Sequence, residues 1–216
     1  MFFITPHDVE AWKRTFTDPS SSPACHTYTL IIHCPQAVTH ADAVEGGWIP
    51  TFSRLVCLDL SGRGKSPDDL GIASVAFQKL PSMLKCLSLF SVCISRPHAF
   101  AFIRSLPFLE DLVLRGGFAN ESEETQIAIS SSTPTSPPLT GTLHLDLSGI
   151  MSATRELLSL PNGLHLQKLR LCWKKEEDVS AAAESVAACF DTLKHLNIVY
   201  DLEGTFSRFR LGHPST

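Results

Sequence analysis

The chain has 216 residues, of which 44% are hydrophobic and 19% charged, and its formal net charge at pH 7 is -4. This apolar content is typical of a folded protein, and the length suffices for one domain with a sizeable core. The negative net charge excludes a general electrostatic attraction to nucleic acid or to an acidic membrane surface, so we expect neither as a partner.

The N-terminal segment and the cysteines indicate an intracellular protein. Acidic and basic residues follow directly on a short apolar start, unlike in a signal peptide, and no apolar run is long enough to span a bilayer. The seven cysteines are odd in number, scattered, and without a C-x-x-C pair. We therefore expect free thiols in a reducing compartment, the cytoplasm or the nucleus.

The first element expected in chain order is a helix over residues 5–16. Thr5 suits the N-cap position and Pro6 the first turn, and we expect this helix to cap the domain that follows. The next segment, "CHTYTLIIHC" at 25–34, brings two Cys and two His together. His26 and His33 are an odd number of residues apart, so on a strand they point to opposite faces, and we expect no metal site.

A Leu-x-Leu or Leu-x-Ile pair then recurs along the chain, with first members 24 to 33 residues apart. The seven pairs are Leu30/Ile32, Leu58/Leu60, Leu87/Leu89, Leu112/Leu114, Leu145/Leu147, Leu169/Leu171 and Leu196/Ile198. In five of them a further Leu stands three positions earlier, which gives the pattern L-x-x-L-x-L/I. Each pair fits a short strand with its leucines on one side, and such units bury that side only by stacking. This period and pattern are those of leucine-rich repeats.

Helical segments separate several of these strands. Apolar residues at helical spacing predict helices over 74–80, 97–106, 153–160 and 176–190. In the last segment the residues that share one face are Val179, Ala182, Ala183, Val186 and Phe190. We therefore expect an α/β fold, a short leucine-rich-repeat solenoid of about 6–7 repeats with a curved parallel sheet inside and helices outside.

The domain organisation follows from composition. A Ser-, Pro- and Glu-rich stretch over 118–141 is expected to be a solvated loop inserted into one repeat. We assign residues 1–209 to a single leucine-rich-repeat domain and residues 210–216 to a disordered tail.

The sequence Gly64-Lys65-Ser66 is similar to the end of a phosphate-binding loop. Such a loop needs G-x-x-x-x-G-K-[ST], but the place of its first Gly is taken by Asp59. The preceding "LDLSG" at 58–62 also occurs again at 145–149, where no Gly-Lys-Ser follows. We interpret Gly62–Ser66 as the exit turn of a repeat, and a nucleotide-binding enzyme that uses this loop is the alternative.

No other segment predicts catalysis. His144 and Asp146 share one face of a strand, but the spacing assigns no Ser or Cys nucleophile to them. Acidic residues flank the only basic groupings, at 63–65 and 168–175, so we expect solvated surface there. Trp173 continues the apolar alternation of its strand and is expected in the core. We predict no enzyme activity and no cofactor.

In a stacked sheet, the residues between the leucines share the concave face, which repeat proteins use for partner recognition. The predicted partner-binding residues are Asp59, Ser88, Phe90, Asp111, Arg115, His144, Asp146, Lys168, Arg170, His195 and Asn197.

A resemblance to a known family of proteins rests on six stretches of the chain taken together. They are "DVEAWKRTF", "EGGWIPTFSRLVCLDL", "LPFLEDLVLRGG", "SSTPTSPPLTGTLHLDLSGIM", "LLSLPNGLHLQKLRLCW" and "DTLKHLNI". The chain resembles, over nearly its whole length, the leucine-rich-repeat portion of a large family of fungal F-box-type proteins.

The resemblance implies repeats that hold a substrate, and an F-box that docks on the adaptor of a cullin–RING ubiquitin ligase. We find no F-box-like segment before the first repeat. We therefore expect a non-catalytic protein–protein interaction module of the substrate-adaptor type without an evident F-box. A truncated, non-functional paralogue is the other interpretation.

Overall fold

The computed structural model describes most of the chain. The described residues are 1–3, 5–18, 21–33, 48–61, 83–90, 96–116, 139–147, 150–160, 162–173, 178–202 and 205–212. The helix expected over 74–80, the segment 62–66 beyond Ser61 and most of the 118–141 insertion lie outside these residues.

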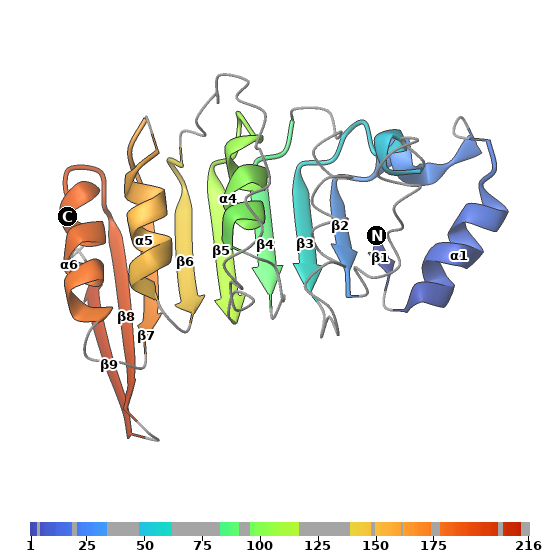
Figure 1. Ribbon diagram of the computed structural model, residues 1–216. Coiled ribbons are helices and arrows are strands. Elements are labelled where there is room, and N and C mark those ends of the chain that lie inside the picture. The colour runs from blue at the N-terminus through green and yellow to red at the C-terminus, as the bar shows by residue number, and fades with distance from the viewer. Residues whose placement is uncertain are drawn as a thin grey trace.

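The strands of the described residues form one sheet of nine, in which spatial order equals chain order (Figure 1). They are β1 (Phe2–Phe3), β2 (Thr29–Ile32), β3 (Cys57–Ser61), β4 (Cys86–Phe90), β5 (Asp111–Gly116), β6 (Thr142–Leu147), β7 (Lys168–Trp173), β8 (His195–Leu202) and β9 (Thr205–Gly212). Strands β1 to β8 pair in parallel, and β9 runs antiparallel to β8. The chain thus has an α/β fold with a largely parallel sheet.

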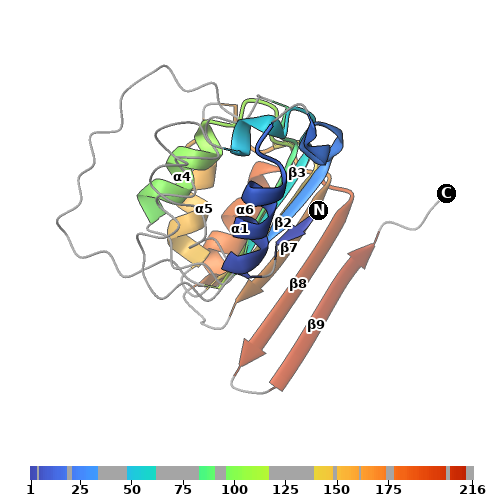
Figure 2. The same ribbon diagram turned by 90° about the vertical axis from the view of Figure 1, so that its right-hand side faces the viewer.

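The described helices lie on one side of this sheet (Figure 2). They are α1 (Pro6–Thr15), α4 (Arg96–Arg104), α5 (Ile150–Leu158), α6 (Val179–Ala188) and the short 3-10 turns η2 (Pro23–His26) and η4 (Ile49–Thr51). The last three α-helices overlap the segments 97–106, 153–160 and 176–190 that were predicted to be helical. In the described part of the chain, no helix combines the length and apolar character needed to cross a bilayer.

Two rows of leucines, in register from strand to strand, face the helices and form the core. The first row is Leu58, Leu87, Leu112, Leu143 and Leu169, and the second is Leu60, Leu89, Leu114, Leu145 and Leu171. All ten side chains are at most 2% exposed. Burying one leucine contributes about 1.5–3 kcal/mol, so these rows are the main stabilising feature of the sheet. Trp173 extends the alternation of β7 and is 6% exposed, as expected for a core residue.

The register corrects the sequence analysis at β6. We matched the pair Leu145/Leu147 with the leucines of the other strands, but Leu143 lies beside Leu112, and Leu145 lies beside Leu114. A shift of two residues leaves every side chain on the same face, because the strand period is two. The alternation of apolar and polar residues therefore could not reveal this difference in register.

The leucine that precedes β6 also stands at a different spacing from its strand. Leu139 is fully buried and its N–H donates to the carbonyl of Leu109 at 3.2 Å, so it occupies the place of the leucine that precedes the other strands. It stands one position farther from its strand than Leu109 does. The backbone at Leu139 has a φ of 32°, outside the regions that non-glycine residues prefer.

The buried side of helix α6 coincides only in part with the face that its apolar pattern indicated. Val179 and Phe190 are 47% and 75% exposed, and the buried residues are Ala181, Ala182, Ser185 and Cys189. The Ser185 hydroxyl donates to the carbonyl of Ala181 at 2.9 Å, and the Cys189 thiol donates to that of Ser185 at 3.0 Å. Because both polar groups find partners inside the helix, they can face the core without an unpaired donor.

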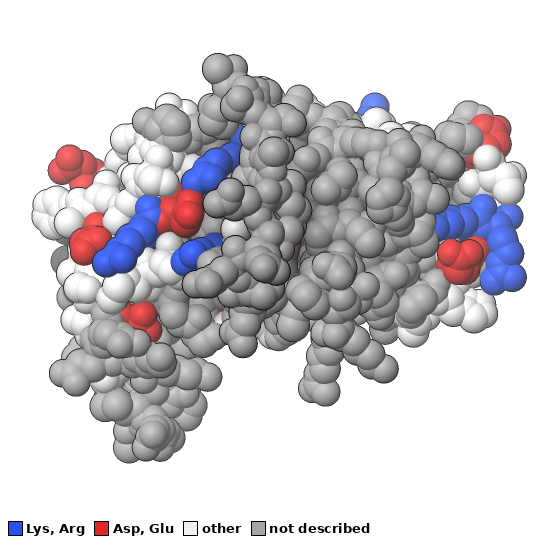
Figure 3. Space-filling view, in the orientation of Figure 1, with Lys and Arg blue, Asp and Glu red and all other residues white. Residues whose placement is uncertain are grey.

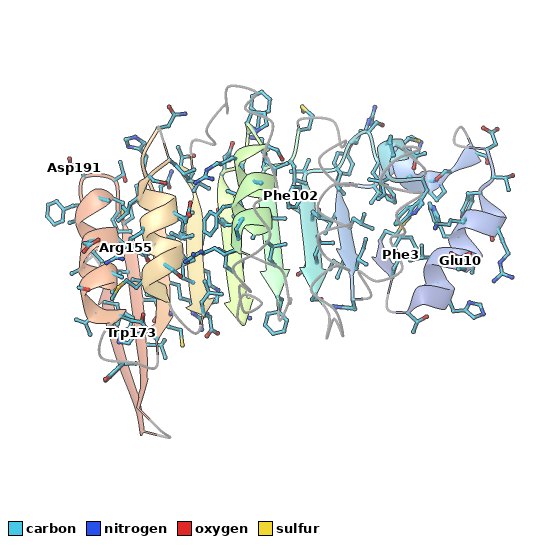
Figure 4. All side chains as sticks on the ribbon, viewed as in Figure 1. Phe3, Glu10, Phe102, Arg155, Trp173 and Asp191 are labelled. Atoms are coloured by element: carbon cyan, nitrogen blue, oxygen red, sulfur yellow. The ribbon has the colours of Figure 1, made fainter. Side chains whose placement is uncertain are left out.

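The N-terminal end of the sheet is covered by α1. The Thr5 hydroxyl accepts from the Asp8 N–H at 3.4 Å and the Asp8 carboxylate accepts from the Thr5 N–H at 2.7 Å, which is a capping box. Trp12 of α1 packs on Phe3 of β1, with ring centroids 5.7 Å apart (Figure 4 labels Phe3 beside this helix). This helix lies within the segment 5–16 where one was expected.

At the opposite end, β9 was not expected from the sequence. Residues 210–212, which we assigned to a disordered tail, continue this strand to Gly212, and 213–216 lie outside the described residues. The apolar residues Phe206, Phe209 and Leu211 do not keep a strict period of two. The segment therefore lacked the alternation by which a strand is recognised.

Candidate partner-binding face

The residues between the leucines form rows on the side of the sheet away from the helices. One row is Asp59, Ser88, Val113, His144, Arg170 and Asn197, and the next is Ser61, Phe90, Arg115, Asp146, Cys172 and Val199. A third contains Cys57, Cys86 and Asp111, with Thr142, Lys168 and His195 farther along. We call these three rows the open face. All eleven residues predicted to bind a partner lie on it, and no described helix lies over it (Figure 2).

The helix side differs from the open face in its charges. Over α5 and α6, basic and acidic side chains lie next to one another (Figure 3). Arg104 of α4 and Glu156 of α5 form an ion pair with an N–O distance of 2.5 Å. Opposite charges that pair in this way leave less charge for a partner, so the open face is the better candidate site.

Asp59 lies toward the β2 end of the open face. Burial raises the pKa of its carboxyl group, against the lowering effects of His33, Ser88 and Arg115. Its Oδ1 atom is buried without a partner. Asp59 therefore has an acceptor that the described structure leaves unpaired.

The carboxylate of Asp111 is used within the sheet and is therefore not free to bind a partner. Its Oδ1 accepts from the Thr142 N–H at 2.5 Å, and its Oδ2 accepts from the Cys86 thiol at 3.6 Å. Burial, followed by Cys57 and Asp111, raises the pKa of the Cys86 thiol to about 12, so it remains a donor at neutral pH. A Cβ atom at Gly141 would collide with the Asp111 carboxylate. These contacts tie β4, β5 and the start of β6 together.

The centre of the open face is a cluster of Arg115, His144 and Arg170. Arg115 Nη2 lies 3.2 Å from His144 Nδ1, and its guanidinium carbon lies 5.6 Å from the centroid of the Phe90 ring. Arg170 stands beside His144 in register on β7. His144 is 6% exposed, whereas both arginines are only half-buried.

The protonation states of His144 and Arg115 determine which of them donates the hydrogen bond between them. Burial, followed by Arg115 and Arg170, lowers the pKa of His144 to about 4, against the opposite effect of Asp146. The imidazole is therefore neutral at pH 7, with one nitrogen protonated. Because a guanidinium only donates, Nδ1 accepts from Arg115 and the proton is on Nε2.

Lys168 and His195 lie side by side at the start of β7 and β8, and both are exposed. Lys168 thus adds a positive charge on β7, the strand that carries Arg170. Asn197 lies in register with Arg170, and its Oδ1 is buried without a partner.

His33 is a residue of this face that sequence reasoning missed. His33 follows β2, and its Nδ1 is hydrogen-bonded to the Ser61 hydroxyl. It stands three positions after Leu30, as Ser61 stands three positions after Leu58, so the repeat spacing was the available signal. Among the described residues, no three His, Cys, Asp or Glu side chains group as metal ligands.

Acidification is expected to destabilise the fold through His144. Between pH 6.5 and about 4 the unfolded chain binds a proton that the folded chain does not, so the free energy of unfolding rises with pH across this window. Below the window the loss amounts to about 2 kcal/mol, after a discount for solvent screening. Urea unfolding at pH 7 and about pH 4 measures it.

The matched control for this prediction is the exposed His165. His144→Phe is expected to flatten the pH dependence, and His165→Phe to leave it unchanged. The raised pKa of Asp59 has the opposite sign, but it is present in both variants and cancels in the comparison. Equal slopes for wild type and His144→Phe would contradict the assignment.

The fold and the face define an α/β protein with a parallel sheet that is covered by helices on one side and carries ordered rows of polar side chains on the other. In comparisons with known proteins, no family model, curated protein or solved structure matches the chain.

Proposed function

We propose that this chain is a non-catalytic protein–protein interaction module, a short leucine-rich-repeat solenoid of about 6–7 repeats whose open face binds a protein. The observation that carries the proposal is the open face itself, on which all eleven predicted residues stand in register. The L-x-x-L-x-L/I pattern and the equality of chain order and strand order support the repeat architecture.

The expected role of the partner comes from the resemblance to F-box-type repeat proteins. In that role the open face holds a substrate for ubiquitination in the cytoplasm or the nucleus. Recovery of cullin-complex subunits with the purified chain is the observation that tests this part separately from the binding itself.

Affinity purification with quantitative mass spectrometry tests the open face directly. Val113 is half-buried at the centre of the face, and Ala183 is exposed on α6. Val113→Arg is expected to deplete the captured partner by about tenfold or more, because a long charged side chain blocks the contact surface. Ala183→Arg adds the same side chain on the helix side and is expected to change nothing. Equal effects of the two variants would remove the open face as the interface.

The alternative is a nucleotide-binding enzyme that uses Gly62–Ser66, a segment that lies outside the described residues. A nucleotide-binding assay on wild type and Lys65→Ala distinguishes the two functions, since strong binding that this variant abolishes would establish the enzyme. A non-functional paralogue is distinguished by the absence of cooperative unfolding.

A further inference from the structure

The central cluster of the open face, formed by Arg115, His144 and Arg170, contains hydrogen-bond donors that have no partner. Three buried nitrogen atoms have no hydrogen-bond partner: Arg115 Nε, His144 Nε2 and Arg170 Nε. Each of them carries a hydrogen, because guanidinium nitrogens only donate and the neutral imidazole holds its proton on Nε2. Three neighbouring strands thus present three unpaired donors, and the His144 side chain is more than nine-tenths buried.

Unpaired buried donors cost free energy, which a ligand that supplies acceptors recovers. A carboxylate has only acceptors, and it pairs with guanidinium groups in a bidentate, charge-assisted geometry. Arg115 is held over the Phe90 ring, so its guanidinium has little freedom to lose on binding. The chemistry that is missing from this cluster is therefore that of an anionic oxygen ligand.

The charges around the cluster restrict the ligand further. Arg115 and Arg170 are positive, and exposed Lys168 adds a further positive charge on β7. Asp146 stands beside Arg115 in register, and Asp59 lies toward the other end. With a net charge of -4 for the whole chain, this surface disfavours a long polyanion such as nucleic acid and favours a short acidic segment.

Unpaired acceptors flank the donors. Asp59 Oδ1 on β3 and Asn197 Oδ1 on β8 are also buried without a partner, and they belong to the same row as His144 and Arg170. Along this row, the unpaired acceptor of Asp59 and the unpaired acceptor of Asn197 thus lie on either side of the unpaired donors of His144 and Arg170. Five strand spacings separate its ends, about 24 Å, which matches roughly seven residues of extended chain.

We propose that the cluster of Arg115, His144 and Arg170 binds the carboxylates of a short acidic peptide segment of the protein partner. The segment lies across the strands, with its acidic residues over the cluster and its backbone N–H groups near Asp59 and Asn197. This inference rests on the proposed function, since it names the chemistry that the open face recognises.

Fluorescence anisotropy tests the proposal with a labelled peptide of about seven residues that has glutamates at its centre. The matched peptide carries glutamines instead. The glutamate peptide is expected to bind at least about tenfold more tightly, and more weakly as salt rises. Arg115→Gln and Arg170→Gln are each expected to weaken it about tenfold.

Arg155→Gln is the matched control, because it removes the same charge from α5 on the helix side (Figure 4) and is expected to change nothing. Thermal unfolding checks that each variant is folded. Where Arg115→Gln is unstable, Arg115→Lys replaces it, since this variant keeps the charge but loses the Nε donor.

Several results would overturn the proposal. They are equal affinity for the two peptides, an equal loss in Arg155→Gln, and no binding up to about 1 mM peptide. Stronger competition by a thymidine oligonucleotide would assign the cluster to nucleic acid, and equal competition by inorganic phosphate would assign it to a free anion. If Val113→Arg still abolishes partner capture in any of these cases, the open face stands as the interface and only the carboxylate chemistry fails. If Val113→Arg has no effect either, the proposed function fails as well.

Discussion

Replacing Phe52 with alanine is expected to lower the free energy of unfolding by about 4 kcal/mol. Phe52 is fully buried, and its ring centroid lies 5.7 Å from that of Trp48 and 6.3 Å from that of Trp12. Trp12 belongs to α1, and both tryptophans pack on Phe3 of β1, so Phe52 is part of the aromatic cluster that joins this helix to the sheet. Its removal leaves a cavity that rigid aromatic neighbours cannot readily close.

Phe190→Ala is the control, because it deletes the same atoms from a side chain that is 75% exposed. Its effect is expected to stay within about 0.5 kcal/mol. Urea unfolding, followed by circular dichroism, gives both values, and an unchanged m-value establishes that only stability has moved. Similar losses in the two variants would mean that Phe52 is not enclosed as the structure places it.

The parts of this fold that could be predicted from the sequence depend on local periods. Alternation of two places Leu87 and Leu89 on one side of β4 and Ser88 on the other, whatever the neighbouring strands are. The composition of the open face followed in the same way. The pairing of β6 could not be predicted in this way, because a shift of two residues leaves the same side chains on each face.

The remaining differences depend on neighbours that a period does not encode. Ser185 of α6 faces the core because its hydroxyl donates to a carbonyl within the helix, although a hydrophobicity pattern treats serine as polar. The low pKa of His144 is caused first by its burial and then by the two arginines that flank it on other strands. Sequence reasoning placed all three residues on one surface, but the unpaired donors became visible only with the contacts between them.

Replacing Leu169 with alanine is expected to lower the free energy of unfolding by about 3 kcal/mol. Leu169 is 1% exposed and stands in register with Leu143 on β6 and Leu196 on β8, so its side chain fills the core between two neighbours. The residue before it, Lys168, is exposed on the open face. Lys168→Ala is expected to change stability by less than about 0.5 kcal/mol, although it removes a side chain of similar length.

This pair of adjacent residues tests which side of β7 faces the helices. A strand turned over by one residue exchanges the two faces completely, so the larger loss would then fall on Lys168→Ala. Urea unfolding of the two variants distinguishes these cases by a difference of about 2.5 kcal/mol, well above the error of the extrapolation. Because the same alternation places Arg170 on the open face, a reversed result would also remove the arginine cluster from that surface.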